Sequence, residues 1–384
     1  MKNLFIGITL LIIISCSSNP KNTDGSHLEG LLIQKPQINY KLNSLPKDIN
    51  VIYFASPKIN KEFPQEVQGL LTNYYSFSEK NKYFPKIKFI NLNQESSCNF
   101  STGRNSFSIV FLLNTSLDDK TYESCLNRIS SLNSLFVVDS SEKQIYKNFR
   151  YFNVDRDEDK YRLLDFINPY NKNLIVIDSE ITKDKYEIGK YWKDKFNKEV
   201  IEYETFNKLE SSEKLFSKLL LSEQSDKRKR KLSRIISKDL EHEPRTRKDL
   251  DALFLSVSTH DARRLKPALD YSYLEGMEVF LVSDWVEDIL FTKFENDLEK
   301  VISIDIPFML PTTLPSELKD LKNRTRDFAT GYDSFEIFLI VKGSKNPNKT
   351  IYKGLTGKLT FKDKFIERKS KIFKIENGSY KYLN

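Results

Sequence analysis

One stretch decides the fold prediction: "RTRKDLDALFLSVSTHDARRLKPALDYSYLEGMEVFLVSD", residues 245–284. An apolar run at 250–258 predicts a buried strand, helical spacing follows through Arg264 and Tyr273, and the apolar run at 277–284 predicts a second strand. A strand, a helix and a strand in this order are typical of a parallel βαβ unit. The stretch therefore predicts an α/β fold.

The same alternation continues on both sides of this stretch. The predicted strands are 49–56, 86–92, 106–114, 134–140, 173–179, 200–206 and 301–308, and the predicted helices are 62–80, 120–132, 183–199 and 324–343. A long helical tract is predicted after 206, and the chain ends in further strands. Two successive α/β units followed by a β-rich tail predict two lobes whose strands are not contiguous in sequence.

The N-terminus, "MKNLFIGITLLIIISC", predicts a secretory signal. Its apolar core from Leu4 to Ile14 is shorter than the roughly 20 residues that span a membrane. The ending at Ser15-Cys16 resembles a bacterial lipobox, which predicts cleavage after residue 15 and acylation of Cys16; the alternative is an ordinary signal with an incidental cysteine. We expect residues 1–15 to be the signal peptide, 16–47 a lipid-anchored flexible tether and 48–384 the folded body. Ser17 and Ser18 follow the cysteine, which favours the outer membrane, facing the periplasm.

Composition disfavours several classes of enzyme. The chain has 61 basic and 53 acidic residues and a formal charge of +8. Its three histidines, His27, His242 and His260, are far apart, and the sequence contains no HExxH, CxxC, EF-hand or GxSxG pattern. We therefore predict no enzyme activity, no metal and no cofactor.

Two cysteines remain in the body of the chain, Cys98 and Cys125. In an oxidising periplasm such a pair can form a disulfide. The alternative is two unpaired thiols, and the sequence leaves both open.

The glycines of "KGLTGKLTFKDKFIERK", residues 353–369, do not form a phosphate loop. Two residues separate Gly354 from Gly357, Lys358 is followed by Leu359, and the segment that follows has strand periodicity. The glycines instead predict a tight turn between strands that needs positive φ.

The densest basic run is "KRKRKLSRIISK", residues 227–238. It is interpreted either as a solvated helix face or as a surface that steers an acidic partner, an anionic glycan or lipid phosphate. A periplasmic location argues against nucleic acid. The residues assigned to steering are Lys227, Arg228 and Arg230.

The opening stretch also resembles the signature of the LppC/LpoA lipoproteins. The matching positions are Arg245, Arg247, Asp249, Asp251, Ala252, Ala262, Arg263, Leu265, Pro267, Leu269 and Tyr271. Further similar segments are "IDIPFML" (304–310), "FATGYDSFEI" (328–337), "GLTGKLTF" (354–361) and "FKIENG" (373–378).

This resemblance implies a two-lobed type 1 periplasmic-binding-protein fold. Each lobe would be a mostly parallel sheet flanked by helices, and three crossings would join the lobes. The expected boundaries are about 48–146 and 278–343 for lobe 1, and about 147–277 and 344–384 for lobe 2.

The resemblance also implies a function. It predicts an outer-membrane lipoprotein that binds and activates a class A penicillin-binding protein and so regulates peptidoglycan synthesis. The alternative is a solute-binding lipoprotein that captures an amino acid, a peptide or another small molecule.

Two departures from the family pattern bear on this choice. The larger members carry an N-terminal helical-repeat domain, where this chain has the predicted tether. In the first lobe, Leu112-Leu113-Asn114 and Ser56-Pro57 replace the Gly-Pro-Leu and Ser-Gly loops. Solute-binding relatives hold ligand with such loops, so their replacement disfavours ligand capture.

Overall fold

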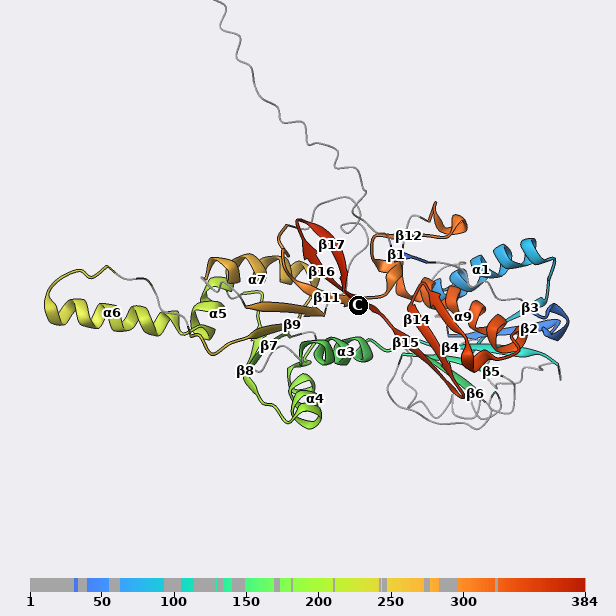
Figure 1. Cartoon of the computed structure of the whole chain (residues 1–384), viewed down its shortest axis with the longest axis horizontal. Coiled ribbons are helices and arrows are strands. Elements are labelled where there is room, and N and C mark those ends of the chain that lie inside the picture. The colour runs from blue at the N-terminus through green and yellow to red at the C-terminus, as the bar shows by residue number, and fades with distance from the viewer. Residues whose placement is uncertain are drawn as a thin grey trace, which may run out of the picture.

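Two mixed sheets lie along the long axis of the molecule (Figure 1). The computed structural model describes residues 31–33, 40–54, 63–92, 105–113, 129, 134–139, 149–168, 173–180, 182–209, 211–241, 243, 247–272, 277–282, 296–321 and 324–383.

The first sheet has eight strands in the order β13-β14-β15-β6-β5-β4-β2-β3. Strands β2 to β6 and β15 pair in parallel, and β14 pairs antiparallel with β13 and β15. The bounds are β2 (Asp48–Tyr53), β3 (Lys86–Asn91), β4 (Phe107–Leu112), β5 (Ser134–Val138), β6 (Phe149–Asn153), β13 (Ile351–Gly354), β14 (Gly357–Lys362) and β15 (Phe365–Lys369).

The second sheet has seven strands in the order β17-β16-β11-β10-β9-β7-β8. Its first five strands in sequence pair in parallel, and the hairpin β16–β17 adds to the β11 side antiparallel. The bounds are β7 (Leu174–Ser179), β8 (Val200–Phe206), β9 (Ala252–Ser256), β10 (Glu278–Val282), β11 (Ile302–Asp305), β16 (Lys371–Glu376) and β17 (Ser379–Leu383).

Helices pack on both sheets and complete two lobes. In the first lobe, α1 (Gln65–Asn81) and α9 (Arg326–Gly343) pack on the eight-stranded sheet. In the second, α3 (Asp157–Ile167) and α4 (Lys185–Phe196) share one apolar cluster with the seven-stranded sheet, and α5 (Ser212–Leu219) and α7 (Thr259–Tyr271) share another. Helix α6 (Ser222–Ile236) projects from the second lobe (Figure 1). The prediction of two α/β lobes with mostly parallel sheets is confirmed.

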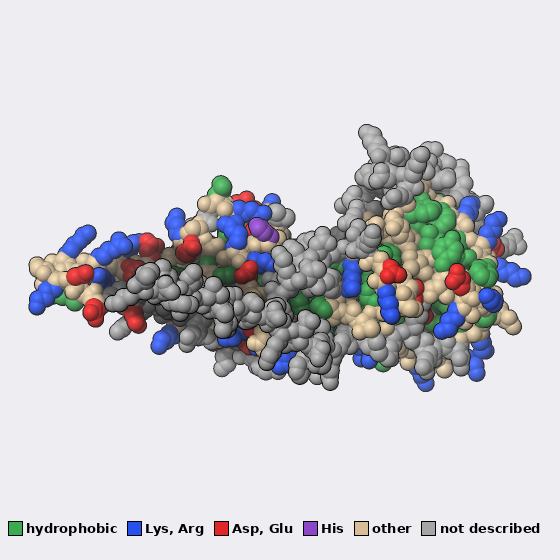
Figure 2. Space-filling view, turned by 90° about the horizontal axis from the view of Figure 1, so that it is seen from above, with side chains coloured by type: hydrophobic (Ala, Val, Ile, Leu, Met, Phe, Trp, Pro, Cys, Tyr) green, Lys and Arg blue, Asp and Glu red, His purple; other side chains and the backbone are tan. Residues whose placement is uncertain are grey.

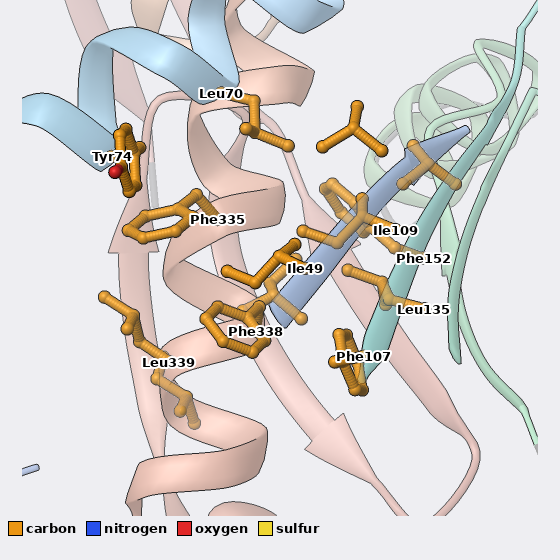
Figure 3. Close-up of a cluster of buried hydrophobic side chains, with 14 of the residues drawn as sticks. Ile49, Leu70, Tyr74, Phe107, Ile109, Leu135, Phe152, Phe335, Phe338 and Leu339 are labelled. Atoms are coloured by element: carbon orange, nitrogen blue, oxygen red, sulfur yellow. The ribbon is translucent and has the colours of Figure 1, made fainter. Parts of the chain in front are cut away.

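Helix α9 is the central element of the first lobe. Phe338 contacts Phe107 of β4 with ring centroids 5.1 Å apart, and Phe335 contacts Tyr74 of α1 with centroids 5.8 Å apart (Figure 3). The helix is therefore buried against both the sheet and α1. The approach of the two helices requires glycine, since a Cβ at Gly331 would lie 1.7 Å from the carbonyl oxygen of Glu66.

The predicted lobe boundaries are wrong in three places. Strand β6 lies within 147–277, which was expected in lobe 2, but it pairs with β5 and β15 of the first sheet. Strands β10 and β11 were expected in lobe 1, but they pair with each other and β10 pairs with β9, which places them in the second sheet. The segment 351–369 was expected in lobe 2, but β15 pairs with β6 of the first sheet. Only β16 and β17 of the tail join the second sheet. The sequence did not predict this division of the tail between the two sheets, because the strands of both lobes look alike in sequence. Only their pairing assigns each strand to a sheet.

Part of the predicted tether is folded onto the body. Strand β1 (Leu31–Leu32) pairs in parallel with β12 (Thr312–Thr313), and Ile33 is buried beside them. Further on, the Tyr40 hydroxyl donates to Glu336 of α9, and Leu45, just after the short helix η1 (Leu42–Ser44), is buried in the core of the first lobe. The described parts of 31–47 are therefore docked, because apolar side chains there bury against the body.

Candidate functional site

Three connections join the lobes, as predicted. The first, residues 154–156, runs from β6 to α3; the second, 306–325, runs from β11 to α9; the third is Ser370, between β15 and β16. The second contains the short helices η2 (Pro307–Met309) and η3 (Ser316–Leu318), and η4 (Pro347–Lys349) lies after α9. In a two-lobed fold the connections form the hinge, so their contacts decide how freely the lobes move.

The Arg368 guanidinium ties the third connection to the first. Its Nη2 donates to the carbonyl oxygen of Asp155 at 3.0 Å and to Oδ2 of Asp159 at 2.9 Å, and its Nη1 donates to Ser370 Oγ at 2.6 Å. The Arg368 side chain is 3% exposed, which shields this ion pair from water. Arg162 of α3 adds a bond to the Ser370 carbonyl oxygen. These contacts hold the first turns of α3 to the strand that leaves the first sheet.

A second ion pair spans the second connection. Arg326, at the start of α9, binds Asp305, at the end of β11, through Nε at 3.3 Å and Nη2 at 2.5 Å. Burial raises the pKa of the Asp305 carboxyl, and the charge of Arg326 opposes that rise. Because β11 belongs to the second sheet and α9 to the first lobe, this fork-shaped pair also crosses the hinge. We call the two pairs, Arg368–Asp159 and Arg326–Asp305, the hinge latch.

Polar residues gather where β7 and β9 end. In open α/β sheets, ligands bind at the carboxyl ends of the strands where the strand order reverses, which here is between these two strands. Thr182 donates to the carbonyl oxygen of Ser256 at 2.7 Å, and Ser256 Oγ donates to Asp184 Oδ2 at 2.6 Å. Most of these groups therefore bond to one another. One exception within the described residues is Asp178 Oδ1, which is buried without a hydrogen-bond partner.

Lys160 of α3 adds a buried cation to this edge. Its ammonium lies 2.8 Å from Asp157 and 3.0 Å from Asp184, and its side chain is 4% exposed. Burial lowers the pKa of Lys160, but the hydrogen bonds and charges of these two carboxylates outweigh burial and raise it. The lysine therefore stays protonated and is neutralised within the protein.

The glycine-rich turn at 354–357 surrounds a carboxylate of the protein itself. Asp333 of α9 accepts hydrogen bonds from the amides of Leu355 (3.0 Å) and Thr356 (2.7 Å), from Thr356 Oγ1 (2.5 Å) and from the Tyr352 hydroxyl (3.1 Å). A Cβ at Gly354 would lie 2.4 Å from this carboxylate. Gly357 has the positive φ predicted for the turn, +133°. Burial raises the pKa of Asp333 to about 6, although its four donors oppose the rise.

The predicted steering residues lie on α6. Arg228 and Arg230 are exposed and make no ion pair within the described residues, whereas Lys227 pairs with Glu223 at 2.7 Å. Arg247, beyond α6, binds Asp249 and Glu202 and fixes the approach to β9. The structure thus separates the basic run from the hinge.

Cys16, Cys98 and Cys125 lie outside the described residues, so the lipidation and the disulfide stay predictions. The described part of the chain holds no group of three or more His, Cys, Asp or Glu side chains arranged to bind a metal. None of the helices in the described residues is both long enough and apolar enough to cross a membrane. Sequence reasoning missed the hinge latch, because its partners are far apart in the chain.

Comparison with known families gives one match. Residues 188–378 match the family model described as LppC putative lipoprotein, which confirms the predicted resemblance over the second half of the chain. No curated protein matches the sequence significantly.

Solved structures share the fold. LpoA from Haemophilus influenzae aligns with a TM-score of 0.58 and 12% identity, covering 91% of this chain and 60% of that one. A putative branched-chain amino acid ABC transporter from Rhodospirillum rubrum aligns with a TM-score of 0.57 and 12% identity, covering 88% and 100%. A protein of the same description from Chromobacterium violaceum gives 0.54 and 15%, covering 85% and 98%. At these identities the alignments establish the two-lobed periplasmic-binding-protein fold, and this chain spans about three-fifths of the LpoA chain.

Proposed function

We propose that this chain, whose residues 188–378 match the LppC family, is a lipoprotein that binds a class A penicillin-binding protein and raises its transpeptidase activity. The family match is the observation that carries the proposal. It covers most of the second lobe, helix α9 and much of the closing strands. The protein would act by contact with its partner, without chemistry of its own.

The hinge latch supports a regulator over a solute-binding protein. Capture of a solute by a two-lobed protein needs the lobes to rotate about their connections. Here the buried Arg368–Asp159 pair ties the third connection to the first, and the partly buried Arg326–Asp305 pair spans the second. Removing one partner of a buried pair is costly, typically about 3–5 kcal/mol. A fixed angle between the lobes suits a surface that must match a partner.

One observation favours the alternative, a solute-binding lipoprotein. Asp178 Oδ1 is buried at the carboxyl end of β7 and has no hydrogen-bond partner within the described residues. A ligand amino group would satisfy it. Against this, the neighbouring Asp178 Oδ2 already accepts from the Lys185 amide, and Lys160 and Asp184 neutralise each other.

The docked residues limit where such a lipoprotein would sit. With acylation at Cys16, the 14 residues 17–30 separate the lipidated cysteine from Leu31 of β1. A fully extended chain of that length reaches about 50 Å. The β1–β12 side of the body would therefore stay within that distance of the outer membrane.

The test combines the full-length protein in detergent with the purified class A penicillin-binding protein of the same organism. Complex formation and the fraction of crosslinked product from lipid II are measured with and without the protein. We expect a complex and more crosslinking. No complex and no change in crosslinking would refute the proposal.

A further inference from the structure

Helix α6 projects from the second lobe with little support from the body (Figure 1). Within this fully described helix Ser225 is the buried residue, and it lies in the first turn, beside α5. Beyond that turn every residue of the helix is exposed or half-buried. Isolated helices of about 15 residues are marginal in water. A contact along α6 would therefore stabilise the helix itself.

The outer half of α6 carries an unpartnered apolar face. Leu232, Ile235 and Ile236 are 53%, 69% and 50% exposed. Their spacing of i, i+3 and i+4 puts them on one side of the helix. This is the pattern of the anchor residues that an amphipathic helix inserts into a groove on a partner.

Basic side chains surround this apolar face. Arg228 lies one turn before Leu232 on the same side, Lys231 borders the triplet at one edge, and Arg234 lies further round the helix. All three are exposed, and within the described residues none makes an ion pair. Figure 2 shows lysine and arginine side chains at this projecting end of the molecule, with acidic side chains among them.

We propose that α6 inserts into an acidic, apolar-floored groove on the penicillin-binding protein; this rests on the proposed function. The apolar triplet would fill the floor, and the arginines and lysines would face carboxylates on the rim. A protein groove fits better than a lipid surface for two reasons. The basic residues lie around most of the helix rather than on one polar face, and three apolar side chains make a small face for insertion into lipid.

Two variants separate the floor contact from the rim contact. Leu232→Gln/Ile235→Gln/Ile236→Gln removes the apolar face, and glutamine keeps good helix propensity. Arg228→Gln/Lys231→Gln/Arg234→Gln removes three charges. The matched control removes three charges from exposed lysines elsewhere on the body: Lys190→Gln/Lys319→Gln/Lys345→Gln.

Binding of the full-length proteins to the immobilised synthase is measured at several ionic strengths. We expect the apolar variant to lose at least 30-fold in affinity, mainly through faster dissociation. The charge variant should associate about tenfold more slowly and show a flatter salt dependence, while the control binds as the parent does. Far-ultraviolet circular dichroism and thermal melting check that both α6 variants keep the fold.

The outcomes distinguish this inference from the proposed function. If the parent does not bind the synthase, the proposed function fails. If the parent binds and both α6 variants bind equally well, the proposed function stands and the assignment of α6 is overturned. A third outcome would also overturn the assignment of α6 to the synthase. In it, the parent binds phosphatidylglycerol vesicles, the apolar variant does not, and both bind the synthase equally well; α6 would then contact a lipid surface.

Discussion

Asp333 offers a direct test of the charge buried under the 354–357 turn. The side chain is fully buried, and four donors from β13 and the turn converge on its carboxylate. Asp333→Asn preserves the shape and removes the charge. One oxygen becomes an NH₂ group, so the Thr356 amide or the Leu355 amide loses its acceptor. The Thr356 hydroxyl can rotate and accept from the new NH₂.

The magnitude follows from two opposing effects. A buried amide without an acceptor costs about 1–3 kcal/mol at any pH. The pKa of Asp333 is raised from 3.8 to about 6, which corresponds to about 3 kcal/mol. The folded-state pKa of Asp333 lies above the unfolded-state pKa. The protonated carboxyl therefore contributes this amount to the free energy of unfolding of the parent below about pH 4, and the contribution is lost as pH rises through about 6. The variant has no such loss.

We therefore expect the variant to be about 1–3 kcal/mol less stable than the parent near pH 4. The difference in the free energy of unfolding should shift by about 3 kcal/mol in favour of the variant by about pH 8. Urea denaturation of both proteins, followed by tryptophan fluorescence across this range, measures the difference. Asp320→Asn, the same change at an exposed carboxyl, is the matched control. If the variant instead became less stable relative to the parent as pH rises, the four donors would have a larger effect on the pKa of Asp333 than burial has. The reasoning would then be wrong.

Three further predictions concern the hinge and the cysteines. Arg368→Met should lower the free energy of unfolding by about 3–5 kcal/mol, against less than about 1 kcal/mol for Lys362→Met in an exposed pair on the neighbouring strand, as calorimetry or urea melts can compare. Cys16→Ala, expressed with its signal, should be lost from the outer-membrane fraction after cell fractionation; if the variant were retained there as completely as the parent, lipidation of Cys16 would be excluded. A disulfide between Cys98 and Cys125 predicts that both thiols are unreactive in denatured, unreduced protein, whereas two reactive thiols would exclude it.

The sequence predicted the secondary structure because both lobes alternate strands and helices. Apolar runs at 173–179 and 200–206 became β7 and β8, and the spacing at 62–80 became α1. Residues 149–167 were missed. There β6 is short and α3 is mostly charged in its first turns, so neither has a long apolar period.

The local sequence did not show to which lobe each strand belongs. Strand β10 is a short apolar segment and β15 mixes apolar and charged residues, and neither pattern shows which of the two sheets the strand joins. The hinge latch was hidden for the same reason, since Arg368 and Asp159 are 209 residues apart. Asp333 did leave a signal: an acidic residue inside the apolar helix of "FATGYDSFEIFLIVKG" must find donors when it is buried.

The hinge latch also predicts how the protein responds to small molecules. A ligand that bound only the folded protein at 100 times its dissociation constant would stabilise it by about 2.7 kcal/mol. For a body of this size that would raise the melting temperature by several degrees. We expect leucine, isoleucine and short peptides at millimolar concentration to change the melting temperature by less than about 1 °C, because the connections are held by the protein's own ion pairs. Arg368→Met, which opens the latch, is measured alongside. A rise of several degrees in the melting temperature of the parent would favour the solute-binding function over the proposed one. Asp178, whose Oδ1 has no hydrogen-bond partner within the described residues, would then be the residue to substitute in order to test ligand binding.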